Sequence, residues 1–125
     1  MSETPIIKVA VKTQYIEEQS KPDQQQYVYA YTIRISNDGN CAAKLISRHW
    51  YITDAKDQTQ EVQGMGVVGE QPVIEANESY TYTSGVVMET ATGTMHGTYT
   101  LKKKDGEEFT ANIPTFALVQ PQALH

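Results

Sequence analysis

The residues whose types and spacing could do chemistry lie at positions 64–72, in the run Gly-Met-Gly-Val-Val-Gly-Glu-Gln-Pro. Gly64, Gly66 and Gly69 spell G-x-G-x-x-G, the pattern with which Rossmann domains bind the pyrophosphate of a dinucleotide. That use requires a strand before the glycines and a helix N-terminus after them. Here Pro72 comes three residues after the last glycine, and residues 73–82 have the composition of strands. We therefore expect a glycine-rich connection between strands and no dinucleotide cofactor.

Three uses of this connection remain open. Successive glycines can let backbone amides surround an anion without a helix, so the loop could bind a phosphate compound. They can equally permit a bulge or a change of sheet, or present a loop to a protein partner. Glu61 and Glu70 flank the loop and no Lys or Arg lies within it, which weighs against phosphate. The candidate ligand or partner loop comprises Gly64, Gly66, Gly69, Glu70, Gln71 and Pro72.

Other residues with chemical potential are few and scattered. No histidine pairs with another histidine or with the single cysteine at the spacing of a structural zinc site. Four glutamates are close enough in sequence to supply oxygens to Mg²⁺, but nothing makes them converge. The cysteine lies beside a turn with no base nearby in sequence. We expect no catalytic residue and no metal site among His49, His96, His125, Cys41, Glu61, Glu70, Glu75 and Glu78.

The elements that must position these residues are strands, because apolar residues alternate with period two along most of the chain. Strands are expected at residues 7–15, 27–35, 45–53, 73–74, 80–84, 86–88, 95–103 and 109–113. Residues 61–68 are expected to be extended but broken by glycines, and the last strand is expected to be disturbed at Pro114 and to carry on over 116–119. Ile46, Trp50 and Ile52 would share one face, with Trp50 as the central buried aromatic. Asp105-Gly106 predicts a two-residue hairpin turn. No segment has helical spacing with caps, so we expect an all-β antiparallel sandwich of about seven to eight strands.

The eight tyrosines have two interpretations. Tyr27, Tyr29 and Tyr31 align on one face of their strand, and Tyr80 and Tyr82 on another. Tyrosine can fill a sandwich core with its hydroxyl at the rim, which is the interpretation we favour. It is also enriched at protein interfaces, so a tyrosine-edged surface near the glycine-rich loop would be a place to look for a partner.

Charge and composition narrow the class of protein. The net charge is −5, from ten Lys and Arg against fifteen Asp and Glu, and the only basic run, 102–104, is succeeded at once by acidic residues. We read that run as a solvated hairpin end, so direct nucleic-acid binding is not expected. No apolar run approaches the roughly 20 residues of a membrane span. One cysteine and an N-terminus without signal-peptide features predict a single cytoplasmic domain over residues 1–125 with no membrane contact.

Several motifs in order along the chain resemble the ApaG (CorD) family. They are Glu-Val-Gln-Gly-x-Gly-Val-Val-Gly-x-Gln-Pro at 61–72, Tyr-Thr-Ser-Gly at 82–85, Gly-x-Met-x-Gly-x-Tyr at 93–99 and Ile-Pro-x-Phe-x-Leu at 113–118. The resemblance implies an immunoglobulin-like, fibronectin type III-like sandwich without settled enzymatic activity. It also implies a protein-interaction role and a link to magnesium and cobalt homeostasis. One departure is Ala76-Asn77, where the family usually has Pro-Gly; Asn tolerates the left-handed conformation, so the turn can survive.

These observations lead to two hypotheses of function. The first is a non-enzymatic interaction or regulatory domain that binds a protein of unknown identity and affects ion balance indirectly. The alternative is a small-ligand binder that holds a phosphate compound or a divalent cation at residues 64–69. A weak homodimer is a further hypothesis, because a sandwich leaves edge strands and residues 6–16 could pair with a second copy.

Overall fold

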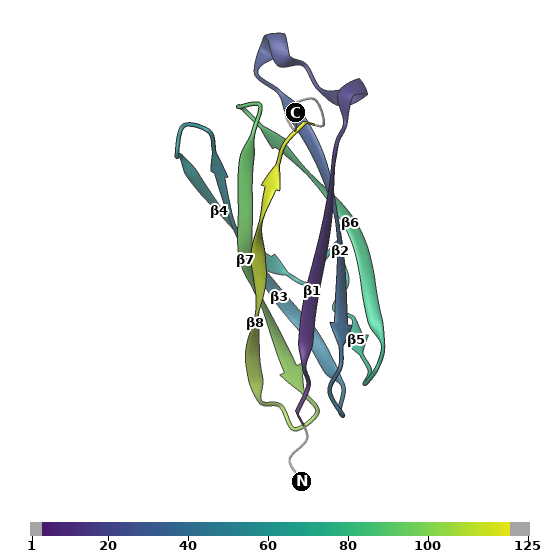
Figure 1. Ribbon diagram of the computed structural model, residues 1–125. Helices are drawn as coiled ribbons and strands as arrows, with labels where there is room; N and C mark the ends of the chain where they lie inside the picture. The colour runs from purple at the N-terminus through teal and green to yellow at the C-terminus, as the bar shows by residue number, and fades with distance from the viewer. Residues whose placement is uncertain (1–3, 121–125) are drawn as a thin grey trace.

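The computed structural model describes residues 4–120, which form two antiparallel sheets packed face to face (Figure 1). The three-stranded sheet has the order β1-β2-β6, with β1 at Ile7–Tyr15, β2 at Tyr27–Asn37 and β6 at Ser79–Met88. The other sheet has the order β4-β3-β7-β8, with β4 at Thr59–Met65, β3 at Ala43–Asp54, β7 at Gly93–Lys103, β8 at Glu108–Leu118, and β5 at Val73–Ile74 paired to β3. Two short 3₁₀ turns, Glu17–Gln19 and Pro22–Gln24, connect β1 to β2. The all-β antiparallel fold expected from the alternation is confirmed.

The core lies between the sheets and is built from alternate residues of the facing strands. Trp50 is 2% exposed and packs edge-to-face against Tyr31 and Phe116, with ring centroids 5.5 and 5.9 Å apart. Its prediction as the central aromatic is confirmed. Each large side chain buried in this way stabilises the fold by about 1.5–3 kcal/mol. The inward faces of β2 and β7 contribute a fully alternating set: Tyr29, Tyr31, Ile33 and Ile35 from one, and Met95, Tyr99 and Leu101 from the other.

The tyrosines belong mainly to this core. Tyr82 is buried and pairs in register with Ile33, while Tyr80 pairs with Ile35. The expectation that Tyr80 and Tyr82 lie on a different face from the β2 tyrosines is therefore wrong, because β6 is the antiparallel neighbour of β2 and continues the same inner face. The hydroxyls of Tyr82 and Tyr99 form a hydrogen bond across the two sheets.

The strands depart from the sequence-based expectation in several places; β8, for example, continues past Pro114 to Leu118. Residues 80–84 and 86–88 are one strand, β6, because Gly85 pairs with Ala30 without breaking the register. In β3 the register shifts between Leu45 and Ser47, which marks a β-bulge at Ile46. The extra residue places both Leu45 and Trp50 in the core although they are an odd number of positions apart. Strict alternation therefore missed Leu45.

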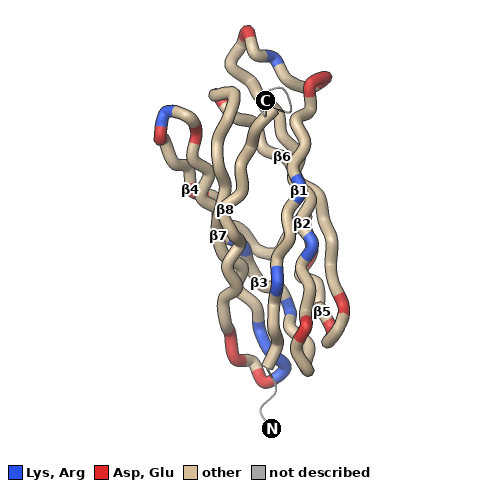
Figure 2. The backbone as a smooth tube through the Cα atoms, viewed as in Figure 1, with Lys and Arg blue, Asp and Glu red and all other residues tan. Residues whose placement is uncertain are grey.

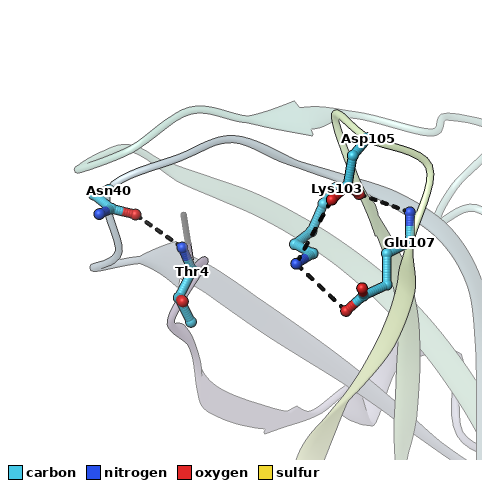
Figure 3. Close-up of polar contacts among 5 residues, drawn as sticks. All are labelled: Thr4, Asn40, Lys103, Asp105 and Glu107. Atoms are coloured by element: carbon cyan, nitrogen blue, oxygen red, sulfur yellow. Dashed lines mark hydrogen bonds and ion pairs between the residues drawn. The ribbon is translucent and has the colours of Figure 1, made fainter. Parts of the chain in front are cut away.

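The β7–β8 hairpin carries the basic run at 102–104. Its loop has three residues rather than two: the Gly106 amide donates to the Lys103 carbonyl, and Gly106 has a φ of +92°. This is a turn that ends in a left-handed glycine, a common three-residue hairpin connection. The Lys103 ammonium lies 4.0 Å from a carboxylate oxygen of Asp105 and 3.4 Å from one of Glu107 (Figure 3). These ion pairs confirm that the run is a solvated hairpin end.

The two lateral sides of the sandwich differ. On one side β1 lies against β8, which brings the two sheets together (Figure 1). On the other side the sheets end at β6 and β4, which are not paired to each other. No helix among residues 4–120 is long and apolar enough to cross a membrane. β1 does lie at a sheet edge, and its pairing with a second copy stays a prediction.

Candidate functional site

The glycine-rich loop is a miniature hairpin at the end of β4. Gly66 has a φ of +65°, and the chain then reverses at Val68 and Gly69, whose φ angles are +42° and +81°. The Val67 amide donates to the Glu70 carbonyl at 2.8 Å, and the Glu70 amide donates back to the Val67 carbonyl at 2.9 Å. Two successive left-handed residues inside this pair define a two-residue turn of the type I′ class. The G-x-G-x-x-G spacing thus serves a turn between strands.

The loop is held against the bulge of β3. The Gly66 amide donates to the Ile46 carbonyl at 2.7 Å, and Nε2 of Gln71 donates to the same carbonyl at 2.9 Å. The Leu45 amide donates to the Pro72 carbonyl at 2.9 Å. The carbonyl of the bulge residue Ile46 therefore holds both arms of the loop, and Gln71 and Pro72 help to position the loop on β3. Glu70 is exposed and makes no hydrogen bond of this kind through its carboxylate within residues 4–120.

The side chain of Arg48, in β3, hydrogen-bonds to the loop. Sequence reasoning did not identify this residue. Its Nη1 donates to the carbonyls of Met65 and Gly66 at 3.1 and 2.8 Å. Gly64 lies directly over the guanidinium, since a Cβ there would come within 2.7 Å of Nη2 of Arg48. The loop sequence lacks a cation, but the tertiary structure supplies one. The position of this cation in the strand could have indicated the contact, because Arg48 is two residues before Trp50 and its side chain therefore lies on the same inward face.

The amides of the loop are largely engaged. Those of Gly66, Val67 and Glu70 all donate to backbone carbonyls. The corresponding N–H groups are therefore not directed at a bound anion. A phosphate at this loop would have to use the exposed tip at Val68 and Gly69.

The loop also concentrates exposed apolar surface. Met65 is 66% exposed, Val68 is 54% exposed and Val73 is 53% exposed. Only Ile6 and Val87 complete the set of large hydrophobic residues that are exposed to this degree among residues 4–120. Three of five such side chains thus lie within nine consecutive positions, on a segment fixed by hydrogen bonds to β3.

The other chemical candidates are dispersed. On the outer face of β3 and β7, Tyr51 stacks between His49 and His96, with ring centroids 4.6 and 5.0 Å apart. His49 Nε2 lies 2.8 Å from a carboxylate oxygen of Glu61. His96 is exposed. Within residues 4–120 no three His, Cys, Asp or Glu residues form a group that could hold a metal ion. Cys41 is partly buried and unpaired, and His125 lies outside the described residues.

The turn at Ala76-Asn77, where the ApaG family usually has Pro-Gly, forms as expected. Asn77 has a φ of +66°, so asparagine takes the left-handed position of the turn between β5 and β6. The buried Asn37 secures this end of the sandwich: its Nδ2 donates to the carbonyls of Cys41 and Ile74 at 2.8 and 3.0 Å. Its Oδ1 accepts from the amides of Gly39 and Ile6.

Three buried tyrosines have perturbed acidity. Burial raises the pKa of Tyr29 to about 12, and the neighbouring Tyr15 and Tyr27 add to the rise. Burial also raises the pKa of Tyr82 and of Tyr99 well above the usual value, with the hydrogen bond between them opposing the rise at Tyr82 and adding to it at Tyr99. All three phenols are protonated near neutral pH, so they act as hydrogen-bonding core residues.

Fold and loop together define a class of protein: an antiparallel sandwich whose described part has eight strands, with a glycine-rich turn docked on a bulged strand. A family model described as the ApaG domain matches residues 17–103. The chain is 53% identical over 124 residues to Protein ApaG of Azoarcus sp. (strain BH72), which covers 99% of this chain and 98% of that protein. It is 55% identical over 119 residues to Protein ApaG of Shewanella baltica (strain OS155 / ATCC BAA-1091), with 95% and 94% covered.

Solved structures give the same result. The crystal structure of the putative ApaA protein from Bordetella pertussis superposes with a TM-score of 0.92 at 47% sequence identity, covering 96% of this chain and 98% of that chain. The chain belongs to the ApaG family, as its sequence motifs indicated.

Proposed function

We propose that this protein is a non-enzymatic interaction domain that docks a protein partner through the loop at residues 64–73. The observation that carries the proposal is the concentration of exposed apolar side chains at Met65, Val68 and Val73 on a segment held rigid by β3. Exposed apolar patches on soluble proteins commonly mark interaction surfaces. A rigid patch also loses little conformational entropy on binding.

The conformation of Val68 supports this role. A β-branched residue at a φ of +42° is strained, because the left-handed region costs a residue with a Cβ roughly 1–2 kcal/mol. Asn or Gly would occupy this position of a type I′ turn without that cost. Strain of this kind is found at functional sites, where the side chain has a use outside the fold. Val68 presents its apolar side chain at the tip of the loop.

An effect on magnesium and cobalt balance, implied by the family resemblance, would then act through the partner. The alternative of a phosphate compound or divalent cation at residues 64–69 is weaker, because three of the loop amides are engaged. Cytoplasmic location and a single domain over the whole chain stay predictions from sequence.

The test is quantitative affinity capture from the native cytosol with wild type, Val68→Asn, Met65→Lys and the control Ile6→Lys. Ile6 is 49% exposed but lies outside the loop. A captured protein whose recovery falls with both loop variants and not with the control supports the proposal. Equal recovery with all four baits refutes it. Calorimetry with Mg²⁺, Co²⁺, pyrophosphate and ATP complements the capture, since saturable heat that the loop variants abolish would assign the loop to a small ligand instead.

A further inference from the structure

The edge strand β6 carries none of the features that usually prevent another strand from adding to a sheet. Residues 79–88 contain no charged residue and no proline, and their register with β2 is unbroken. Figure 2 shows this strand without charge along its length. In the sequence, the acidic residues Glu78 and Glu89 flank it. Soluble proteins normally protect such edges with charges, proline, bulges or covering segments.

The other edges of the two sheets do have protection. β1 presents the exposed Lys8 and Lys12. β8 contains Pro114 within a register shift opposite residues 95–97 of β7. β4 carries Glu61 beside His49. In an antiparallel ladder with one neighbour, about half of the backbone amides and carbonyls of an edge strand face outward. At β6 these groups are the natural partners of an added strand.

Beside this edge lies a groove between the two sheets, which we call the β4–β6 groove. Gln60 and Val62 of β4 form one wall and residues 84–87 of β6 form the other. Tyr31, Trp50 and Met95 line it from the core side. It continues past Ile52 toward Asp54 and Glu89. The inward side chains of a strand added to β6 would enter this groove, because side chains alternate between the two faces of a sheet.

Trp50 supplies a second, independent observation. It lines the groove and is 2% exposed, yet its indole Nε1 has no hydrogen-bond acceptor among residues 4–120. Buried polar groups are nearly always hydrogen-bonded, so an unpartnered donor requires an explanation. A segment bound in the groove would provide one if the side chains that cover Nε1 moved aside to let its acceptor reach the indole.

The two ends of the groove carry opposite charges. Arg48 lies at the end near Ser84, and Asp54 and Glu89 line the other end near Met88. A peptide antiparallel to β6 would begin beside Asp54 and Glu89 and would run toward Arg48. It would be complementary if it carried a basic residue near its start and an acidic residue about five positions later, which is the spacing from Glu89 to Ser84.

We propose that β6 accepts an extended segment of a partner protein as an added antiparallel strand, with alternate apolar side chains in the β4–β6 groove. This rests on the proposed function insofar as the partner is a protein, but it uses a surface other than the loop. Strand addition is an established mode of peptide recognition, in which backbone hydrogen bonds supply affinity and pockets for alternate side chains supply specificity.

The test is an NMR titration of the ¹⁵N-labelled full chain with a synthetic ten-residue peptide, the length of β6. The peptide alternates Val and Thr, with Lys near its start and Glu five positions later. Saturable shifts of the amides of residues 79–88 and of the Trp50 indole N–H are expected. A peptide with Lys and Glu exchanged should bind about tenfold more weakly. A peptide N-methylated at alternate residues should not bind, because it cannot form the ladder.

Two variants separate strand addition at β6 from docking at the loop. Val87 is 62% exposed on β6, so Val87→Lys adds an edge charge without disturbing the core and should weaken peptide binding about tenfold. Val68→Asn, which tests the loop, should leave peptide binding unchanged. Binding that is insensitive to N-methylation, shifts confined to residues 64–73, or no shifts at all would overturn the strand-addition proposal. Self-association in sedimentation that Val87→Lys abolishes would assign the edge to a second copy and would also overturn it.

Discussion

Replacing Val68 by asparagine should stabilise the fold while it removes the apolar tip of the loop. Val68 occupies the first central position of a type I′ turn with a φ of +42°, and Gly69 comes next with a φ of +81°. Asn-Gly is the preferred pair for such a turn, because both residues tolerate the left-handed conformation. The substitution therefore acts on backbone strain at a site where the side chain is already 54% exposed.

The magnitude comes from two opposing effects. Relief of left-handed strain contributes roughly 1–2 kcal/mol. Loss of the partly buried valine methyl groups costs about 0.7 kcal/mol, because full burial of valine contributes about 1.5 kcal/mol, the low end of the range for large apolar side chains, and this side chain is half exposed. The free energy of unfolding should thus rise by about 1 kcal/mol, which corresponds to an increase in Tm of about 4 °C for a chain of this length.

Urea and thermal unfolding of wild type, Val68→Asn and Val68→Ala are the assay. Alanine removes the same methyl groups but keeps a Cβ in a residue that does not favour the left-handed region, so it serves as the matched control. An asparagine variant no more stable than the alanine variant would refute the strain argument. If asparagine raises stability and also lowers partner recovery, the loss of binding cannot be ascribed to unfolding, because the two effects have opposite signs.

Three further predictions concern the core. Tyr82→Phe leaves the Tyr99 hydroxyl buried without its hydrogen-bond partner and should destabilise the fold by about 1–3 kcal/mol. In a double-mutant cycle measured by urea unfolding, the combined change Tyr82→Phe with Tyr99→Phe should cost less than the sum of the two single changes. Stability should fall as pH rises above 10, because the unfolded tyrosines ionise there while the folded Tyr29, Tyr82 and Tyr99, with raised pKa values, remain protonated. Between pH 9 and 11, Tyr82→Phe should reduce the total loss of stability in urea unfolding by about 1.4 kcal/mol, because one tyrosine that titrates near pH 10 in the unfolded chain is removed. An unchanged loss would contradict the assignment. Gly97→Ala should destabilise by more than about 2 kcal/mol, because its Cβ would collide with the His49 backbone carbonyl. Gly64→Ala would meet only the far end of the Arg48 side chain and should cost about 1 kcal/mol or less. Equal losses in thermal unfolding would show that contact with the backbone does not decide the cost.

Part of the candidate site could be predicted from the sequence, and part could not. Pro72 and the strand composition after it were enough to reject a dinucleotide fingerprint, since that chemistry needs a helix at this point. Arg48 was missed because its contact with the loop joins positions 17 and 18 apart on paired strands. The β4–β6 groove was missed for the same reason, because its walls come from two different sheets.

The sequence by itself determined the strands, the burial of Trp50 and the left-handed turn at Asn77, because period-two alternation and turn residues report local backbone geometry. Only the tertiary structure decided the bulge at Ile46, the common inner face of Tyr31 and Tyr82, and the position of β6 at an unprotected edge. Those features depend on which strands become neighbours. That choice is made by burial of side chains far apart along the chain, which no local pattern contains.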